Sequence, residues 1–302
     1  MPHRISESHR PLLPKSTCWR TVPDAHQVWA HSVCSKEMLR AALMDPTITA
    51  IEADILMGHV KGREASSVGR IPIMAHPPDR VSDLFLDDFL EACMEDGLRH
   101  LKLDFKELLA LQVSLPILAS HAKRFWENGQ SIFINADILP GPGRKGAPAT
   151  IPADEFFAAV LGHCPGIPLS LGWTCCTAAF GEGYTKADCE EMLRVYKEYV
   201  HKLPVASGGV VFAVSLRLAQ KSFPELVNLL RHAPTSQLLL WTGNGELAVS
   251  PTTVTRLRSW AKNEGVSERV GFDCRTSETV LEAWCNDLLI CLGGIWHWLG
   301  MM

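Results

Sequence analysis

Two stretches decide the fold of this chain: IEADI at residues 51–55 and LKLDFK at residues 101–106. In both, apolar residues alternate with charged ones, which is the pattern of a β-strand whose successive side chains point to opposite faces. One face of each strand is therefore apolar, and the other carries charges. The charged residues that share a face are Glu52 and Asp54 in the first stretch, and Lys102, Asp104 and Lys106 in the second.

Strand and helix patterns alternate along most of the chain. The predicted strands are residues 28–33, 50–56, 71–75, 100–105, 131–139, 168–173, 210–216, 237–242 and 269–273. Helical spacing lies between them at residues 36–44, 86–94, 113–128, 153–161, 186–201, 223–232 and 251–263. About eight strand–helix repeats in roughly 250 residues predict an α/β fold, a single (β/α)8 TIM-type barrel. A doubly wound open sheet is the structural alternative.

The composition is that of a soluble globular enzyme. Of 302 residues, 47% are hydrophobic and 21% charged, and the net charge is −4. No basic excess indicates a nucleic-acid partner, so we expect a small-molecule ligand. The ten cysteines lack zinc-site spacing, and we expect reduced thiols in a cytoplasmic protein. The oligomeric state is not indicated.

The chain divides into three parts by pattern. Residues 1–25 are polar, contain prolines and lack periodicity, so they predict a flexible arm. Residues 26–278 hold the strand–helix repeats, and residues 279–302 form an atypical apolar tail. Its most apolar part, residues 288–302, is shorter than the roughly 20 residues that a membrane span needs. We expect a docked helix there, with peripheral membrane contact as the alternative and an irregular end to the barrel.

A further strand, at residues 131–139, also turns polar side chains, Asn135 and Asp137, to one face. These strands direct charged and amide groups towards the carboxyl end of the barrel, where barrel enzymes place their sites. Buried charges are costly unless they are paired or bind a metal. Carboxylates with an amide nearby suit a hard cation, so we expect Mg²⁺, with Ca²⁺ or Mn²⁺ as alternatives. An interior ion-pair network, for example between Lys102 and Glu52, is the competing interpretation.

Two histidines follow predicted strands at the same end of the barrel. His31 ends the first strand, and His76 follows the strand at residues 71–75. Histidine exchanges protons near neutral pH, so beside an acidic metal cluster each is a candidate acid or base. Trp173 and Trp241 end later strands and are candidates for the wall of a pocket.

Seven segments, in order from about residue 27 to 275, resemble the Menorin family. They are WAH at 29–31, IEAD at 51–54, PIMAHPP at 72–78, KLDFK at 102–106, INADILPGP at 134–142, SLGWT at 170–174 and WTG at 241–243. That family is similar to the phospholipase-C-like phosphodiesterase superfamily, which includes glycerophosphodiester phosphodiesterases and the spider-venom sphingomyelinase D enzymes. The resemblance implies a barrel that binds a divalent cation and a phosphodiester.

The resemblance also implies roles for individual residues. The cation would lie on Glu52, Asp54 and Asp104, with His31 and His76 as the acid and base. The candidates for binding substrate or phosphate are Lys106, Lys102, Asn135, Asp137, Trp173, Arg217 and Trp241.

This chain departs from related sequences at two positions. Cys34 stands where relatives carry Asn, and Ser215 stands where they carry Arg. Arg217 lies two residues beyond Ser215, on the same face, so we expect either that it compensates for the change or that phosphate binding is altered.

We weigh three functions. The first is a metal-dependent phosphodiesterase or phospholipase-D-like lyase acting on a glycerophosphodiester or a (lyso)phospholipid, with two histidines as acid and base. The second is a non-catalytic binding or signalling protein on a retained phosphodiesterase scaffold. The third is a barrel with an interior salt-bridge network and no ligand. The substrate, the compartment and the form of the product, cyclic or open, are not indicated by the residues.

Overall fold

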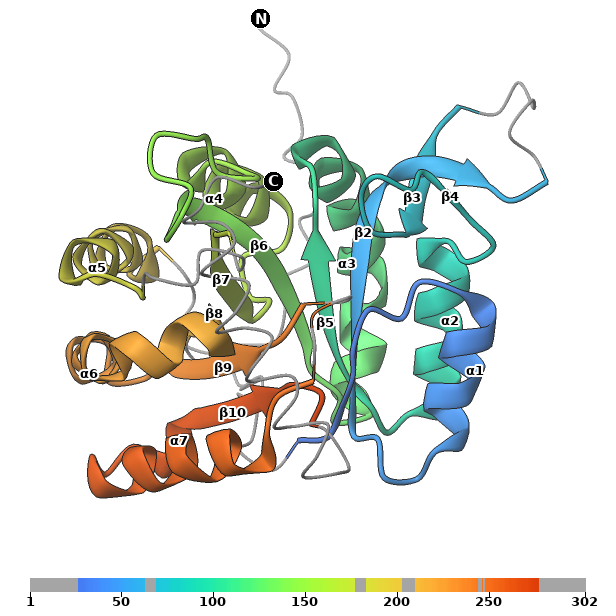
Figure 1. The fold of residues 1–302 in the computed structure, drawn as a ribbon. Helices are drawn as coiled ribbons and strands as arrows, with labels where there is room; N and C mark the ends of the chain where they lie inside the picture. The colour runs from blue at the N-terminus through green and yellow to red at the C-terminus, as the bar shows by residue number, and fades with distance from the viewer. Residues whose placement is uncertain are drawn as a thin grey trace, which may run out of the picture.

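Parallel strands form a nearly closed barrel (Figure 1). The computed structural model of the protein describes residues 27–62, 69–176, 183–202, 210–243, 246 and 248–276. Within these residues, eight strands follow one another around the barrel in the order β1-β2-β5-β6-β7-β8-β9-β10. They are β1 (Trp29–Ala30), β2 (Ala50–Val60), β5 (His100–Phe105), β6 (Ile132–Pro140), β7 (Leu169–Thr174), β8 (Val210–Ser215), β9 (Gln237–Trp241) and β10 (Val270–Asp273). The predicted (β/α)8 architecture is confirmed, and the open-sheet alternative is wrong.

Helices lie outside this wall and connect consecutive strands (Figure 1). They are α1 (Lys36–Met44), α2 (Leu86–Asp96), α3 (Leu108–Glu127), α4 (Ala153–His163), α5 (Lys186–Val200), α6 (Leu216–His232) and α7 (Pro251–Asn263). Several begin at residues whose side chains bond the free N–H groups of the first turn. Ser35 accepts from the Met38 N–H, and Thr185 forms a reciprocal capping box with Asp188. Among the described residues, no helix is both long and apolar enough to cross a bilayer.

Two helices begin earlier than the sequence predicts. Helix α3 begins at Leu108, although Pro116 lies inside it, and α6 begins at Leu216, directly after β8. The backbone of Ser222 departs from helical geometry two residues before Pro224, so α6 consists of two helical pieces joined at a kink. The predicted start at residue 223 matches only the second piece.

Strand β2 is longer than predicted and extends past the barrel rim (Figure 1). Its outer part pairs antiparallel with β3 (Ile71–Met74) and, at its end, parallel with the short β4 (Val81–Ser82). Strand β3 is therefore not part of the barrel wall. It carries the chain back to the rim, which brings residue 76 to the mouth of the barrel.

The barrel interior has an apolar lower part and a polar upper part. Phe133, Val211 and Leu239 form a separate buried cluster with Trp29 packed against it. Towards the carboxyl ends of the strands, the inward residues are polar and mostly buried. A much larger core fills the space between the outer face of the sheet and the helices. The apolar cluster lies at the bottom of the barrel, and the polar part faces the carboxyl end, where we expect a ligand to approach.

Strands β1 and β10 meet at the seam of the barrel without a ladder between them in the described residues. The side chains close the gap instead, because His31 Nδ1 donates to Asp273 Oδ2 at 3.0 Å. The predicted arm at residues 1–25 and tail at 279–302 lie outside the described residues.

Candidate active site

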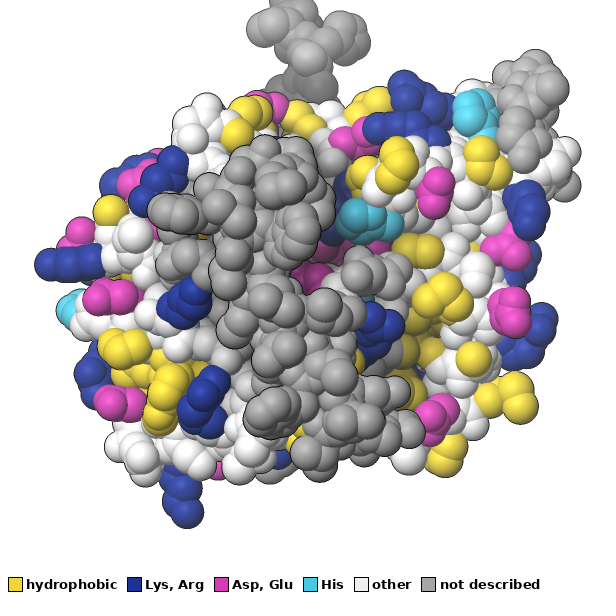
Figure 2. Space-filling view, in the orientation of Figure 1, with side chains coloured by type: hydrophobic (Ala, Val, Ile, Leu, Met, Phe, Trp, Pro, Cys, Tyr) yellow, Lys and Arg dark blue, Asp and Glu magenta, His cyan; other side chains and the backbone are white. Residues whose placement is uncertain are grey.

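Three carboxylates from two neighbouring strands lie together at the carboxyl end of the barrel. Glu52 and Asp54 come from β2, and Asp104 comes from β5, directly beside Asp54 in the ladder. One oxygen from each residue lies within 4.8 Å of the others. Glu52 is 1% and Asp54 3% exposed. Figure 2 shows acidic and histidine side chains gathered in a hollow of this face, close to β2 and β3.

Ser32 holds two of these carboxylates in place. Its backbone N–H donates to Glu52 Oε2 at 2.6 Å, and its hydroxyl donates to Asp54 Oδ2 at 3.0 Å. The residue adopts a left-handed φ of 54°, which is rare for a residue with a side chain. Strand β1 ends at Ala30, earlier than predicted, although the Val33 N–H still donates to the carbonyl oxygen of Glu52 at 2.9 Å. The residue was not predicted as part of the site.

Lys106 neutralises the carboxylates from the other side. Its ammonium lies 2.8 Å from Asp54 Oδ1 and 2.6 Å from Asp104 Oδ2. Burial alone would lower the pKa of Lys106, but the charges of Asp104 and Asp54 hold that pKa well above its ordinary value. Burial would likewise raise the pKa of Asp54, yet the Lys106 ammonium holds it below its ordinary value. Both groups are therefore ionised at neutral pH.

His31 lies between two acids at the barrel seam. Its Nδ1 is 3.0 Å from Asp273 Oδ2 and 3.4 Å from Glu52 Oε2. Burial lowers the pKa of His31, but the charges of Asp273 and Glu52 outweigh burial and raise it to about 9. Because a carboxylate can only accept, Nδ1 carries a proton that it donates to Asp273, and Nε2 is the nitrogen that can exchange a proton with a substrate.

Asp273 also binds Lys102, whose ammonium lies 2.9 Å from Asp273 Oδ2. Lys102 is 3% exposed, and its ammonium lies over the ring of Trp29. The ion pair of Lys102 is therefore with Asp273 and not with Glu52, although the interior does contain an ion-pair network of the kind that the competing interpretation expects. Lys102 is engaged inside the barrel, which does not favour its predicted contact with phosphate. Asp273 was missed in the sequence, although it ends a predicted strand like the other acids.

His76 occupies the rim and is exposed. Its Nδ1 lies 2.7 Å from the carbonyl oxygen of Pro77. A carbonyl oxygen accepts only, so Nδ1 donates, and the neutral ring presents the lone pair of Nε2. In both histidines Nδ1 therefore donates, but the surroundings differ: His31 lies against two acids that raise its pKa to about 9, whereas the Nδ1 partner of His76 is an uncharged backbone carbonyl.

Burial and neighbouring negative charges raise the pKa of two acids of the site, Asp137 and Glu52. Burial, followed by the charge of Asp104, raises the pKa of Asp137 to about 6. Burial and the neighbouring carboxylates raise the pKa of Glu52 to about 7, although the His31 charge opposes them. The backbone of Gly172 makes room for Asp137, because any side chain there would collide with its carboxylate.

The other predicted residues lie at different depths. Asn135 pairs with Asp104 in the ladder and is 3% exposed. Among the residues that the structure describes, no group forms a hydrogen bond with its Oδ1. Trp173 is 1% exposed and packs against Tyr184 and Phe212, so it belongs to the core rather than to an open wall. Trp241, at the end of β9, is half-buried. Their contacts with a substrate stay predictions.

The expected compensation by Arg217 rests on a strand that does not continue. Strand β8 ends at Ser215, and Arg217 is the second residue of α6, so strand alternation does not place it. Its Nε donates to Glu246 Oε2 at 3.0 Å. Ser215 is fully buried.

Cys34 points at the carboxylate cluster, with its Sγ 3.7 Å from Asp54 Oδ2. Burial raises the pKa of this thiol to about 12, so it is neutral.

This donor set fits a hard divalent cation. Three carboxylate oxygens from separate residues are close enough to share one ion, and oxygen ligands are those that Mg²⁺, Ca²⁺ and Mn²⁺ prefer. In their ionised forms, the five acids named in this interior outnumber its three cations by two: the acids are Glu52, Asp54, Asp104, Asp137 and Asp273, and the cations are His31, Lys102 and Lys106. One divalent ion would balance that excess.

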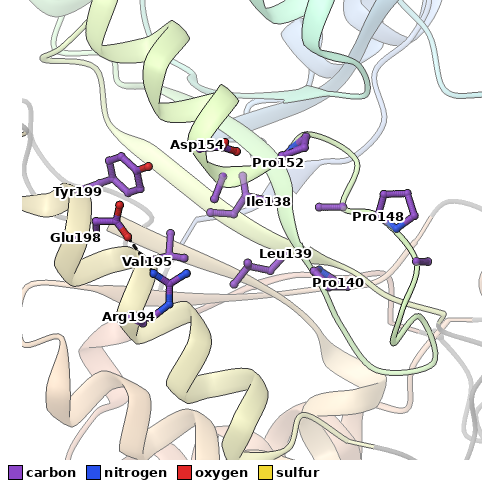
Figure 3. Close-up of a pocket in the computed structure, with 13 residues that line it drawn as sticks. Ile138, Leu139, Pro140, Pro148, Pro152, Asp154, Arg194, Val195, Glu198 and Tyr199 are labelled. Carbon is purple, nitrogen blue, oxygen red and sulfur yellow. Dashed lines mark hydrogen bonds and ion pairs between the residues drawn. The ribbon is translucent and has the colours of Figure 1, made fainter.

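A separate groove of about 530 Å³ lies on the flank of the barrel, between α4, α5 and the loop after β6 (Figure 3). Its lining is mainly apolar, from Ile138 to Tyr199, and Arg194 pairs with Glu198 at its edge. None of the predicted site residues lines it. The groove is therefore not the site of the chemistry predicted for the carboxylates.

Two solved structures resemble this one at low sequence identity. A deoxyribose phosphate aldolase from Aeropyrum pernix covers 68% of this chain and 76% of its own, with 19% identity and a TM-score of 0.41. A glycerophosphodiester phosphodiesterase from Parabacteroides distasonis covers 88% of this chain and 97% of its own, with 8% identity and a TM-score of 0.42. Neither likeness bears on the chemistry of the site.

The likeness in sequence is much stronger. The chain is 34% identical over 232 residues to Protein FAM151B of Homo sapiens. The aligned region covers 75% of this chain and 76% of that protein. Residues 24–273 match the Menorin N-terminal domain. This match spans every strand of the barrel and all the acids and histidines of the site. The chain belongs to the Menorin family.

Proposed function

We propose that this protein is a metal-dependent phosphodiesterase or phospholipase-D-like lyase that acts on a glycerophosphodiester or a (lyso)phospholipid. The observation that carries the proposal is the combination of three carboxylates within 4.8 Å of one another and two histidines at the same end of the barrel. Each histidine has its Nδ1 held by an acceptor, at Asp273 and at Pro77. Such an arrangement prepares both rings for proton transfer through Nε2.

Glu52, Asp54 and Asp104 would hold the cation, with Mg²⁺ as the expected ion and Ca²⁺ or Mn²⁺ as alternatives. A divalent ion there supplies electrostatic stabilisation of the charge that develops on a phosphoryl oxygen. Ser32 fixes two of these carboxylates, so the ligands are oriented before the ion arrives.

The surroundings of the two histidines support a different role for each. His31 keeps its proton at neutral pH because its pKa is raised to about 9, so it serves as the acid that protonates the leaving oxygen. His76 presents an unprotonated Nε2 when neutral, so it serves as the base that takes the proton of the nucleophile. That nucleophile is water or a neighbouring hydroxyl of the substrate, and the phosphorus–oxygen bond to the leaving group breaks. Water gives an open phosphate, and an internal hydroxyl gives a cyclic one.

Phosphorus NMR on a panel of substrates tests this function. Purified protein with Mg²⁺, Ca²⁺ or Mn²⁺ is mixed with a glycerophosphodiester, a lysophospholipid and sphingomyelin, and new resonances report open or cyclic products. His31→Ala and His76→Ala are each expected to lower the rate by about 10²–10⁴-fold. His121→Ala, on the outside of α3, removes a histidine whose Nδ1 also bonds a backbone carbonyl and is expected to leave the rate unchanged. No turnover of any substrate, with any of the three cations, would refute the proposal.

A binding or signalling role on the retained scaffold is the second candidate. The observation in its favour is that Arg217 is already paired with Glu246, and Ser215 is buried where related sequences carry Arg. In that case the protein would bind a cation and a phosphate ester without turnover. Calorimetric binding of both ligands, with unchanged phosphorus spectra after long incubation, would support this role over the enzymatic one.

A further inference from the structure

Lys106 occupies the oxygens that a cation would need. Its ammonium contacts Asp54 Oδ1 and Asp104 Oδ2, whereas the second oxygen of Asp54 is held by Ser32. A cation bound by Asp54 and Asp104 would lie roughly 2.0–2.6 Å from their oxygens. An ammonium that stays on the same oxygens would then be only a few ångströms from the ion, and the two like charges would repel each other strongly at that range.

The side chain of Lys106 can move without disturbing the fold. Its backbone N–H donates to the carbonyl oxygen of Ile55 at 2.9 Å, which fixes the main chain at the top of β5. The side chain is 19% exposed, so it reaches the mouth of the barrel rather than the packed interior. A lysine carries its charge on a flexible four-carbon stem with three rotatable donors. Displacement therefore needs changes in side-chain torsions only.

We propose that Lys106 couples two sites: it substitutes for the cation on Asp54 and Asp104 in the metal-free protein, and it turns to bind an oxyanion once a divalent cation takes these carboxylates. This inference rests on the proposed function, because the cation is part of that function. The oxyanion, a phosphate ester, supplies the negative charge that the ammonium loses on leaving the carboxylates. The oxyanion site is thus complete only in the cation-loaded protein, and binding is ordered, with the cation first.

The proposed coupling and a purely orienting role of Lys106 predict opposite changes in Mn²⁺ affinity when Lys106 is replaced. If Lys106 competes with the cation, Lys106→Met removes the competitor, and Mn²⁺ binds at least about tenfold more tightly. If Lys106 only orients the carboxylates, the same variant loses an outer partner of the ligands, and Mn²⁺ binds about 10–100-fold more weakly. Cation affinity therefore separates the two roles without any measurement of activity.

Two titrations carry the test. Calorimetry measures Mn²⁺ affinity for the wild type, Lys106→Met, the milder Lys106→Gln, and Lys36→Met. The last variant removes one positive charge from an exposed ion pair with Asp88 and controls for overall charge. Line broadening of the phosphorus resonance of dimethyl phosphate then measures oxyanion binding to the Mn²⁺-loaded proteins, with a calorimetric titration of the same ester into metal-free protein as the comparison.

The expected results are tighter Mn²⁺ binding by both Lys106 variants and not by Lys36→Met, and at least about tenfold weaker binding of dimethyl phosphate when either Mn²⁺ or the Lys106 ammonium is absent. Unchanged or weaker Mn²⁺ binding by the Lys106 variants overturns the inference. Equal affinity for dimethyl phosphate with and without Mn²⁺ also overturns it. These failures leave the proposed function in place if the wild type still binds Mn²⁺ and turns over substrate. A wild type that binds no cation removes the proposed function together with this inference.

Discussion

The free energy of unfolding is expected to fall between pH 7.0 and 8.5 because of His31. Its pKa is about 9 in the folded protein and 6.5 when unperturbed. A group whose pKa is raised by folding binds its proton more tightly in the folded state, so its contribution is complete below pH 6.5 and is lost as the pH rises through 9. The full shift corresponds to about 3 kcal/mol.

Only part of that contribution lies inside a convenient window. Proton linkage with these two pKa values gives about 2.6 kcal/mol at pH 7.0 and about 0.8 kcal/mol at pH 8.5. The loss across the window is therefore about 2 kcal/mol. The imidazole is 23% exposed, so solvent screening is modest and the figure holds as an order of magnitude.

The assay is urea unfolding followed by tryptophan fluorescence, in the presence of EDTA, at both pH values. Other groups also titrate, so the quantity to follow is the difference between the wild type and His31→Gln, from which the contributions of groups that do not contact His31 largely cancel. That difference is expected to shrink by about 2 kcal/mol from pH 7.0 to 8.5. Parallel behaviour of the two proteins across the window would refute the assignment of a cationic His31.

Asp273→Asn tests the cause of the raised pKa. The variant removes the larger of the two charges that raise the pKa of His31, so most of the pH dependence is expected to disappear. It also leaves Lys102 buried without its carboxylate, which is expected to cost about 3–5 kcal/mol at every pH. A variant that keeps the full pH dependence would show that Asp273 is not the partner that holds the proton.

Three further changes test the site and its support. Ser32→Ala and Ser32→Gly are both expected to bind Mn²⁺ about 10–100-fold more weakly than the wild type in calorimetry. The glycine variant is expected to be about 1 kcal/mol more stable than the alanine variant, because glycine adopts a positive φ freely. Wild-type Mn²⁺ affinity in both variants would contradict the role of Ser32 in holding the carboxylates. Asp104→Asn is expected to abolish the rise in melting temperature that added Mg²⁺ produces, whereas Asp154→Asn on α4 keeps it; a full rise in both would place the cation elsewhere. Gly172→Ala is expected to cost about 1–3 kcal/mol in urea unfolding because the methyl group collides with a carboxylate, whereas Gly162→Ala has open space and is not expected to destabilise.

The fold could be predicted because its signals are local. Alternation of apolar and polar residues identifies β2, β5 and β6, and helical spacing identifies the segments between them. The errors fall where tertiary packing overrides the local signal. Helix α3 begins before the predicted start at residue 113, and α6 begins before the kink at Ser222, because their apolar faces are buried against the sheet. Burial therefore decides how far each helix extends.

The site could be predicted only as far as side-chain direction goes. Alternation places Lys102 and Glu52 on one face, which suggested that they pair, yet Lys102 binds Asp273, a residue 171 positions away in the chain. That contact exists because β10 closes the barrel beside β1, and closure is a property of all the strands together. Ser32 was not found by any pattern, because its left-handed backbone and its hydrogen bonds to two carboxylates exist only in the folded barrel. Glu52, Asp54, Asp104 and Asp137 were visible in the sequence because each one shares a strand face with another polar residue. Asp273 and Ser32, which hold the neighbouring groups, could be identified only after the strands had met.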